Sequence, residues 1–165
     1  MTASRIEPRG GGWGPSQGPH QDAVRGMFDR IAHRYDAANH AMSAGVDVLW
    51  RRRAMAPLLA ELPQGGRVLD LGAGTLDGAL AIRRRRPDAR VVAADFAREM
   101  LRVGRGKRGA GSIATHAADG HDLAYASGAF AAAFSAFCVR NLRDLPRALG
   151  ELRRVLAPGA ALVVL

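Results

Sequence analysis

Residues 68 to 77, Val-Leu-Asp-Leu-Gly-Ala-Gly-Thr-Leu-Asp, decide the fold of this chain. The run begins as a short buried strand, turns at two glycines and continues into a helix, as in the nucleotide pockets of α/β sheets. Gly72 and Gly74 let a ligand approach the backbone, because no Cβ stands in its way. Asp70 lies where the strand ends. The stretch therefore predicts a nucleotide-type ligand at the mouth of a parallel sheet.

The acids around this turn indicate the kind of ligand. A dinucleotide site holds its pyrophosphate on the helix N-terminus and prefers a third glycine, whereas Asp77 stands at that position here. A carboxylate there would repel a pyrophosphate, but Asp70 and Asp77 together would attract a positively charged ligand. S-adenosylmethionine fits this description, because it carries a sulfonium, an amino group and an adenosine but no phosphate.

Two further predicted strands also end on acids. Asp95 follows the strand 90–94 at about the spacing at which an acid meets ribose hydroxyls, and Asp119 follows the strand 112–117, where it could accept from an adenine amino group. For either residue taken singly, a helix cap or a turn is an equally good explanation. The ordered set of acids behind a glycine turn favours the cofactor site.

Composition bounds the class of protein. A chain of 165 residues with 48% hydrophobic residues is about one globular domain. No apolar run approaches the roughly 20 residues that span a membrane, no secretory signal is visible, and Cys138 is the single cysteine, so we predict a cytoplasmic location. The five histidines are scattered without ligand spacing, which predicts no metal site.

The net charge of +9 raises the question of an anionic partner. Arginine runs at 51–53 and 83–86 lie on predicted helices, where they form either solvated faces or a surface for contact with an anionic membrane. Aromatic residues make up only 5% of the chain, which argues against nucleic-acid binding.

The order of predicted elements indicates an α/β fold. Residues 1–20 are rich in glycine and proline and are predicted to be a disordered tail, residues 21–63 form an N-terminal helical lid, and residues 64–165 form the α/β domain. In that domain strands alternate with helices, which implies a parallel sheet with right-handed crossovers. The predicted helices are 22–35, 46–62, 75–86, 97–107 and 145–156, and the predicted strands are 67–71, 90–94, 112–117, 130–137 and 160–165.

Three motifs resemble one family in order along the chain. Residues 35–39, Tyr-Asp-Ala-Ala-Asn, followed by Ser43 and Trp50, resemble the N-terminal signature of the ubiquinone/menaquinone biosynthesis C-methyltransferases. Residues 137–141, Phe-Cys-Val-Arg-Asn, are similar to that family's F-G-x-R-N segment, and residues 153–159 are similar to its R-V-L-K-P-G segment. The resemblance covers about residues 24 to 165.

The resemblance implies a Rossmann-like class I methyltransferase that uses S-adenosylmethionine to methylate a ring carbon of a polyprenylated quinol, either a ubiquinone or a menaquinone precursor. Arg140 and Asn141 would face the ring as catalytic residues, with Arg140 stabilising a phenolate, and Tyr35 would lie in the lid with Asn39. The cofactor-binding residues that the resemblance implies are Asp70, Gly72, Gly74, Thr75, Asp77, Asp95, Phe96, Asp119 and Gly120.

Departures from the family pattern carry expectations of their own. Leu76 replaces the glycine of the family's T-G-D, and its bulk is expected to weaken cofactor binding if that position needs a positive φ or close approach. The chain stops at Leu165, before the family's E-x-S segment, so the resemblance implies strand order 3-2-1-4-5 without the last two strands. Residues 160–165 would then be an open edge, able to pair with a second copy or a partner chain.

Two other functions stay open at this point. The chain could be a truncated, weakly active or inactive cofactor-binding or interaction module of the same fold. Nucleic-acid methylation rests on charge alone, because the sequence has no N-P-P-Y target-base motif.

Overall fold

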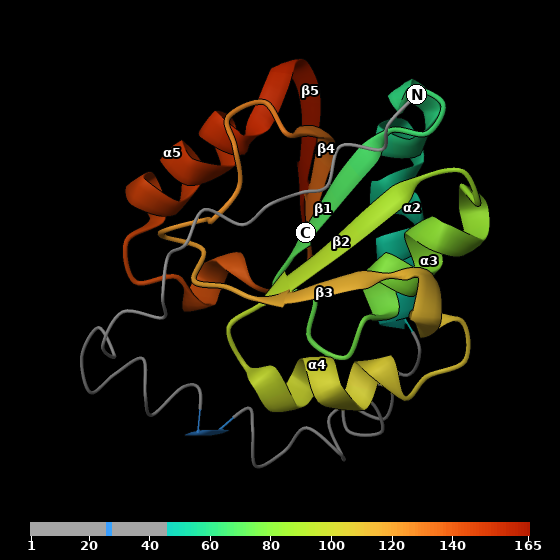
Figure 1. Cartoon of the computed structure of the whole chain (residues 1–165), viewed down its shortest axis with the longest axis horizontal. Helices are drawn as coiled ribbons and strands as arrows, with labels where there is room; N and C mark the ends of the chain where they lie inside the picture. Colours follow the sequence, from blue (N-terminus) through green and yellow to red (C-terminus); the bar gives the residue numbers. More distant parts are fainter. Residues whose placement is uncertain (1–25, 28–45) are drawn as a thin grey trace.

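The computed structural model describes residues 26–27 and 46–165, which form a parallel sheet with helices on both faces (Figure 1). The strands are β1 (Arg67–Leu71), β2 (Arg90–Asp95), β3 (Ala114–Ala117), β4 (Phe130–Ser135) and β5 (Leu156–Val164). The helices are α2 (Val46–Glu61), α3 (Asp77–Arg85), α4 (Arg98–Arg105) and α5 (Leu145–Val155), with short 3₁₀ turns η1 (Ala110–Ser112) and η2 (Val139–Asn141).

The sheet has the order β3-β2-β1-β4-β5, and every neighbouring pair is parallel. This confirms the predicted strand order. β1 lies at the centre because its residues are almost continuously apolar and buried, as a strand covered on both faces must be. Arg67 at its start and the buried Asp70 are the exceptions in that run, and the Cα partners of Asp70 are Ala93 in β2 and Phe134 in β4.

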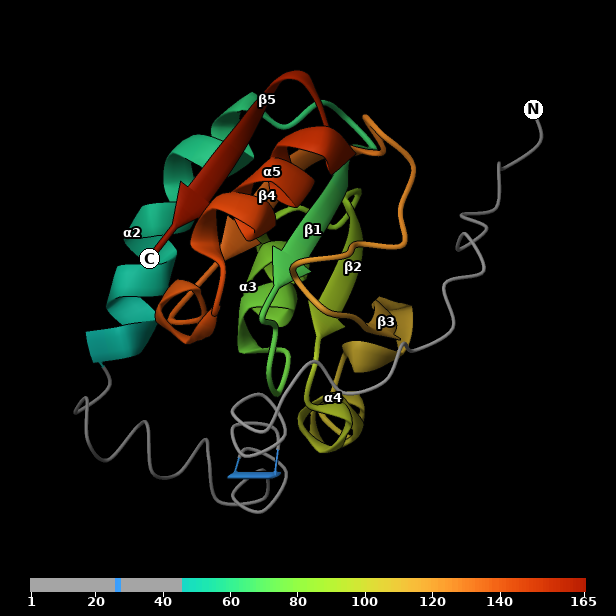
Figure 2. The ribbon, with the colours of Figure 1, turned by 90° about the vertical axis from the view of Figure 1, so that its left-hand side faces the viewer.

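Helices cover the two faces of the sheet unequally. Figure 1 shows α5 on one side of the sheet and α2 and α3 on the other. Met55 of α2, Leu80 of α3 and Leu101 of α4 share one core cluster, whereas Leu152 of α5 belongs to the cluster on the opposite face. The view turned by 90° shows α2 running alongside β5 (Figure 2). No helix in the part of the chain that the structure describes is both long and apolar enough to cross a membrane.

Several boundaries differ from the sequence prediction for identifiable reasons. α3 begins at Asp77 rather than Thr75, because Leu76 adopts a left-handed conformation with φ 71°. β5 begins at Leu156 rather than Ala160: Leu156 pairs with Phe130, a bulge follows, and regular pairing resumes at Ala161. Of the predicted helix 22–35, only residues 26 and 27 lie within the described part, and both are helical.

Candidate functional site

The glycine turn after β1 stands at the carboxyl edge of the sheet, as predicted. Gly72 and Gly74 have φ values of 73° and 52°, and the amides of Gly72 and Ala73 both donate to the carbonyl of Ala94 at 2.8 and 3.1 Å. A Cβ on Gly72 would lie 2.3 Å from the Cβ of Cys138 and 2.4 Å from its Sγ. Position 72 therefore requires glycine both for its backbone angle and for the close approach of another segment.

Asp70 is the most perturbed acid of the turn. Its side chain is buried, and burial raises the pKa of its carboxyl group to about 7. A hydrogen bond from the backbone amide of Ala79 and the positive charge of Arg51 act in the opposite direction and lower this pKa. Oδ2 of Asp70 has no hydrogen-bond partner within the described residues. A buried polar atom without a partner is costly and marks a place where a ligand can donate.

Gly78 makes room for this carboxyl group. A Cβ at position 78 would lie 2.6 Å from Oδ2 of Asp70, so any larger residue would displace the carboxyl. Asp70, Gly72, Gly74 and Gly78 all line one small hollow of about 40 Å³, which is about the size of a water molecule or an ammonium group.

Asp77 is not the free negative charge that the sequence suggested. Its Oδ1 accepts from Nζ of Lys107 at 2.7 Å, and its Oδ2 lies 3.6 Å from Nη1 of Arg51. Nζ of Lys107 also donates to Oγ1 of Thr75 at 3.0 Å. Two cations already compensate Asp77, so the attraction of a cationic ligand rests mainly on Asp70.

Asp95 holds the turn to the end of β2. Its Oδ2 accepts from the amide of Gly74 at 2.8 Å, and its Oδ1 accepts from the amide of Ala97 at 2.8 Å. Phe96 follows it and is half-buried. Asp95 therefore fixes the glycine turn relative to the start of the segment that leads into α4.

Asp119 forms a local turn. Its Oδ1 accepts from the amide of His121 at 2.9 Å and lies 2.6 Å from Nδ1 of the same residue. The neighbouring Gly120 is buried, and a Cβ there would lie 3.2 Å from Leu142. The turn-forming role that the sequence analysis left open for Asp119 is thus present in the structure.

Arg140 and Asn141 lie in η2, shortly after β4, and both are exposed. The start of this segment is fixed by Phe137, which has a positive φ of 57° and lies under the guanidinium group of Arg51, 5.4 Å from the ring centre. The segment that carries Arg140 is therefore anchored next to the glycine turn. Tyr35, the third predicted catalytic residue, lies outside the described residues, as does Asn39.

Sequence reasoning missed four residues of this site, Arg51, Lys107, Gly78 and Cys138. Arg51 comes from α2 and touches Asp47, Asp77 and Phe137, so it ties the first described helix to the glycine turn. Lys107 stands out in the sequence only as its sole lysine. Gly78 directly follows the motif and could have been noticed there. Cys138 replaces the glycine of the F-G-x-R-N pattern, and burial raises the pKa of its thiol to about 12.

Comparison with known proteins gives concordant results. Residues 17–165 match the model of the ubiE/COQ5 methyltransferase family. The demethylmenaquinone methyltransferase of Thermus thermophilus is 48% identical over 141 residues, which are 84% of this chain and 63% of that protein. The enzyme of the same name from Deinococcus radiodurans is 43% identical over 156 residues, 92% of this chain and 64% of that protein. The chain thus spans a little less than two thirds of the length of these curated relatives.

A solved structure shows the same fold at low identity. A protein from Methanococcus maripaludis, described as a putative S-adenosyl-L-methionine-dependent methyltransferase, superimposes with a TM-score of 0.66 at 16% identity. The match covers 93% of this chain and 67% of that one.

Proposed function

The chain belongs to the ubiE/COQ5 methyltransferase family, and from this premise we propose that it transfers a methyl group from S-adenosylmethionine to a ring carbon of a polyprenylated quinol. The observation that carries the proposal is the unpartnered Oδ2 of Asp70, buried beside two glycines of positive φ. A cytoplasmic location, with contact at the inner face of the membrane where a polyprenylated substrate would reside, is part of the proposal.

The residues at the turn fit this cofactor. The hollow beside Asp70 is of the right size for an ammonium group, and Oδ2 can accept from it. Arg51 lines the same hollow and offers a guanidinium group to a carboxylate, so with Asp70 ionised both charged groups of a methionine moiety would have partners of opposite sign. Asp95 and Phe96 would take the ribose side, and Asp119 and Gly120 the adenine side.

The chemistry asked of this chain is positioning and charge stabilisation. When bound, S-adenosylmethionine supplies an electrophilic methyl group. A quinol carbon becomes nucleophilic once a ring hydroxyl loses its proton, so the protein must stabilise a phenolate and hold the carbon in line. Arg140 is exposed at the edge where the glycine turn lies, and its guanidinium group would stabilise the phenolate. Asn141 and Tyr35 would orient the ring.

Two measurements on matched variants test the proposal. Isothermal titration with S-adenosylmethionine should show binding that Asp70→Asn weakens and that Glu61→Gln, an exposed change on α2, leaves intact. Methyl transfer to a short-chain demethylmenaquinol should fall about 100-fold in Arg140→Ala, while cofactor binding is retained. Methylation of an unrelated substrate alone would reject the quinol, and cofactor binding without any transfer would favour the inactive module.

A further inference from the structure

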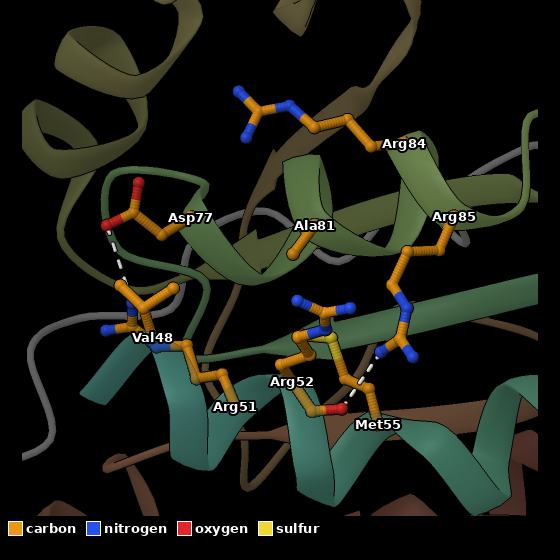
Figure 3. Close-up of a pocket in the computed structure, with 8 residues that line it drawn as sticks. All are labelled: Val48, Arg51, Arg52, Met55, Asp77, Ala81, Arg84 and Arg85. Atoms are coloured by element: carbon orange, nitrogen blue, oxygen red, sulfur yellow. Dashed lines mark hydrogen bonds and ion pairs between the residues drawn. The ribbon is translucent and has the colours of Figure 1, made fainter. Parts of the chain in front are cut away.

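A second hollow lies between α2 and α3 and adjoins the hollow at the glycine turn, with which it shares Arg51 and Asp77. It is a groove of about 430 Å³ lined by Val48, Arg51, Arg52, Met55, Asp77, Ala81, Arg84 and Arg85. Figure 3 shows Arg52 of α2 and Arg85 of α3 extending from facing sides toward the middle of this groove, and Arg51 at one end beside Asp77. Arg84 extends away from α2 over the other side of α3.

The groove carries an excess of positive charge. Asp77 is the only acid among the described residues that line it, and it is already shared by Arg51 and Lys107. Arg85 donates from Nη1 to the backbone carbonyl of Arg52 at 2.9 Å, which positions its guanidinium group without neutralising it. Two guanidinium groups that face one another without an acid between them repel, unless an anion bridges them.

Apolar side chains lie in and beside the groove. Val48 lines it and Leu49 is the next residue on α2, and their relative exposures are 50% and 45%. Met55 forms a buried part of the floor, one helical turn further on. A small soluble anion buries no hydrocarbon against these apolar side chains. A ligand with an anionic headgroup and a hydrocarbon part is stabilised both by the arginines and by burial of apolar surface.

We infer that this groove binds the phosphate group of an anionic phospholipid and thereby holds the protein on a membrane surface. Guanidinium groups match phosphate oxygens in a fork geometry, which suits Arg52 and Arg85 to this headgroup. Val48 and Leu49 would enter the interfacial region beside it. The inference deepens the membrane contact that is part of the proposed function, but it does not depend on methyl transfer, because it needs neither cofactor nor substrate.

Vesicle binding tests the inference. The full chain is mixed with vesicles of phosphatidylglycerol and phosphatidylcholine, or of phosphatidylcholine alone, and the bound fraction is measured by sedimentation. Binding should require phosphatidylglycerol, and the double variant Arg52→Gln/Arg85→Gln should weaken it about 25-fold, because each basic residue near an anionic surface contributes about fivefold. The matched control is Arg90→Gln/Arg153→Gln, which removes the same charge from the start of β2 and from α5, and it should lose less than fivefold.

Three results would overturn the inference. Equal losses in the groove variant and the control would show that net charge alone attracts the protein. Unchanged binding by the groove variant would exclude the groove. Stabilisation by inorganic pyrophosphate, tested by thermal unfolding, without vesicle binding would assign the groove to a soluble phosphate. If the double variant unfolds, the single variant Arg52→Gln is tested in its place. The hydrogen bond from Arg85 is accepted by the backbone carbonyl of residue 52, so the Arg52→Gln substitution leaves it intact.

Discussion

The ionisation of Asp70 should make the stability of this protein fall between acidic and neutral pH. Burial raises the pKa of its carboxyl from 3.8 to about 7. A raised pKa in the folded state means that the folded protein holds this proton more tightly than the unfolded chain. The stability that it contributes is fully present below the unfolded pKa and is lost as the pH rises through the folded pKa. A shift of about three pKa units corresponds to a loss on the order of 4 kcal/mol, complete by about pH 8.

Asp70→Asn is the matched perturbation, since it keeps the shape of the side chain and cannot ionise. Urea unfolding of both proteins at steps from pH 4.5 to 8.5 gives the difference in unfolding free energy. We expect this difference to shift in favour of the variant by several kcal/mol as the pH rises. Burial lowers the pKa of His116, which gives the opposite pH dependence, but this contribution is common to both proteins and cancels. A difference that stays constant from pH 4.5 to 8.5 would refute the argument.

The remaining predictions concern the packing of the turn. Leu76→Gly should destabilise the fold by about 2 to 3 kcal/mol in thermal or urea unfolding, because loss of a fully buried leucine outweighs the relief of a left-handed conformation; equal or greater stability would contradict this. Gly72→Ala should strongly destabilise the fold, because the added methyl group would clash with the side chain of Cys138. Adding Cys138→Gly should recover at least about 1 kcal/mol of the lost unfolding free energy in a double-mutant cycle. A coupling energy of zero would show that these two side chains do not meet. Gly78→Ala should abolish cofactor binding in isothermal titration by displacing the carboxyl of Asp70, and unchanged affinity would argue that Asp70 does not contact the cofactor.

Local patterns were enough to predict the sheet but not the electrostatics of the site. The run at 67–71 is apolar apart from Arg67 at its start and Asp70, and its predicted bounds are those of β1. The compensation of Asp77 could not be predicted in this way, because Lys107 is 30 residues away and Arg51 comes from another helix. Which cation reaches Asp77 depends on how α2 and α4 pack against the sheet, and that is a property of the whole fold.

The resemblance to the family supplied information that local patterns lack, and its departures can now be interpreted physically. Cys138 stands where the pattern has glycine, and its side chain packs on Gly72 instead of leaving that space open. A ligand that approaches the backbone at Gly72 must therefore pass beside the thiol. The raised pKa keeps this thiol protonated near neutral pH, so it packs on Gly72 as a weakly polar side chain and is a poor nucleophile.

Leu76, which stands where the family pattern has glycine, packs against α4. The positive φ that the expectation named is present, and the side chain is fully buried in the core and does not line the hollow at Asp70. Weaker cofactor binding because of Leu76 stays a prediction. A Cβ on Gly104 of α4 would lie 2.5 Å from Cγ of Leu76 and 2.7 Å from the carbonyl carbon of Thr75. Position 104 therefore requires glycine for two reasons, the side chain of Leu76 and the backbone of Thr75. Gly104→Ala should thus disturb the turn as severely as a change within it, and truncation of Leu76 should relieve only the part of that clash that its own side chain makes.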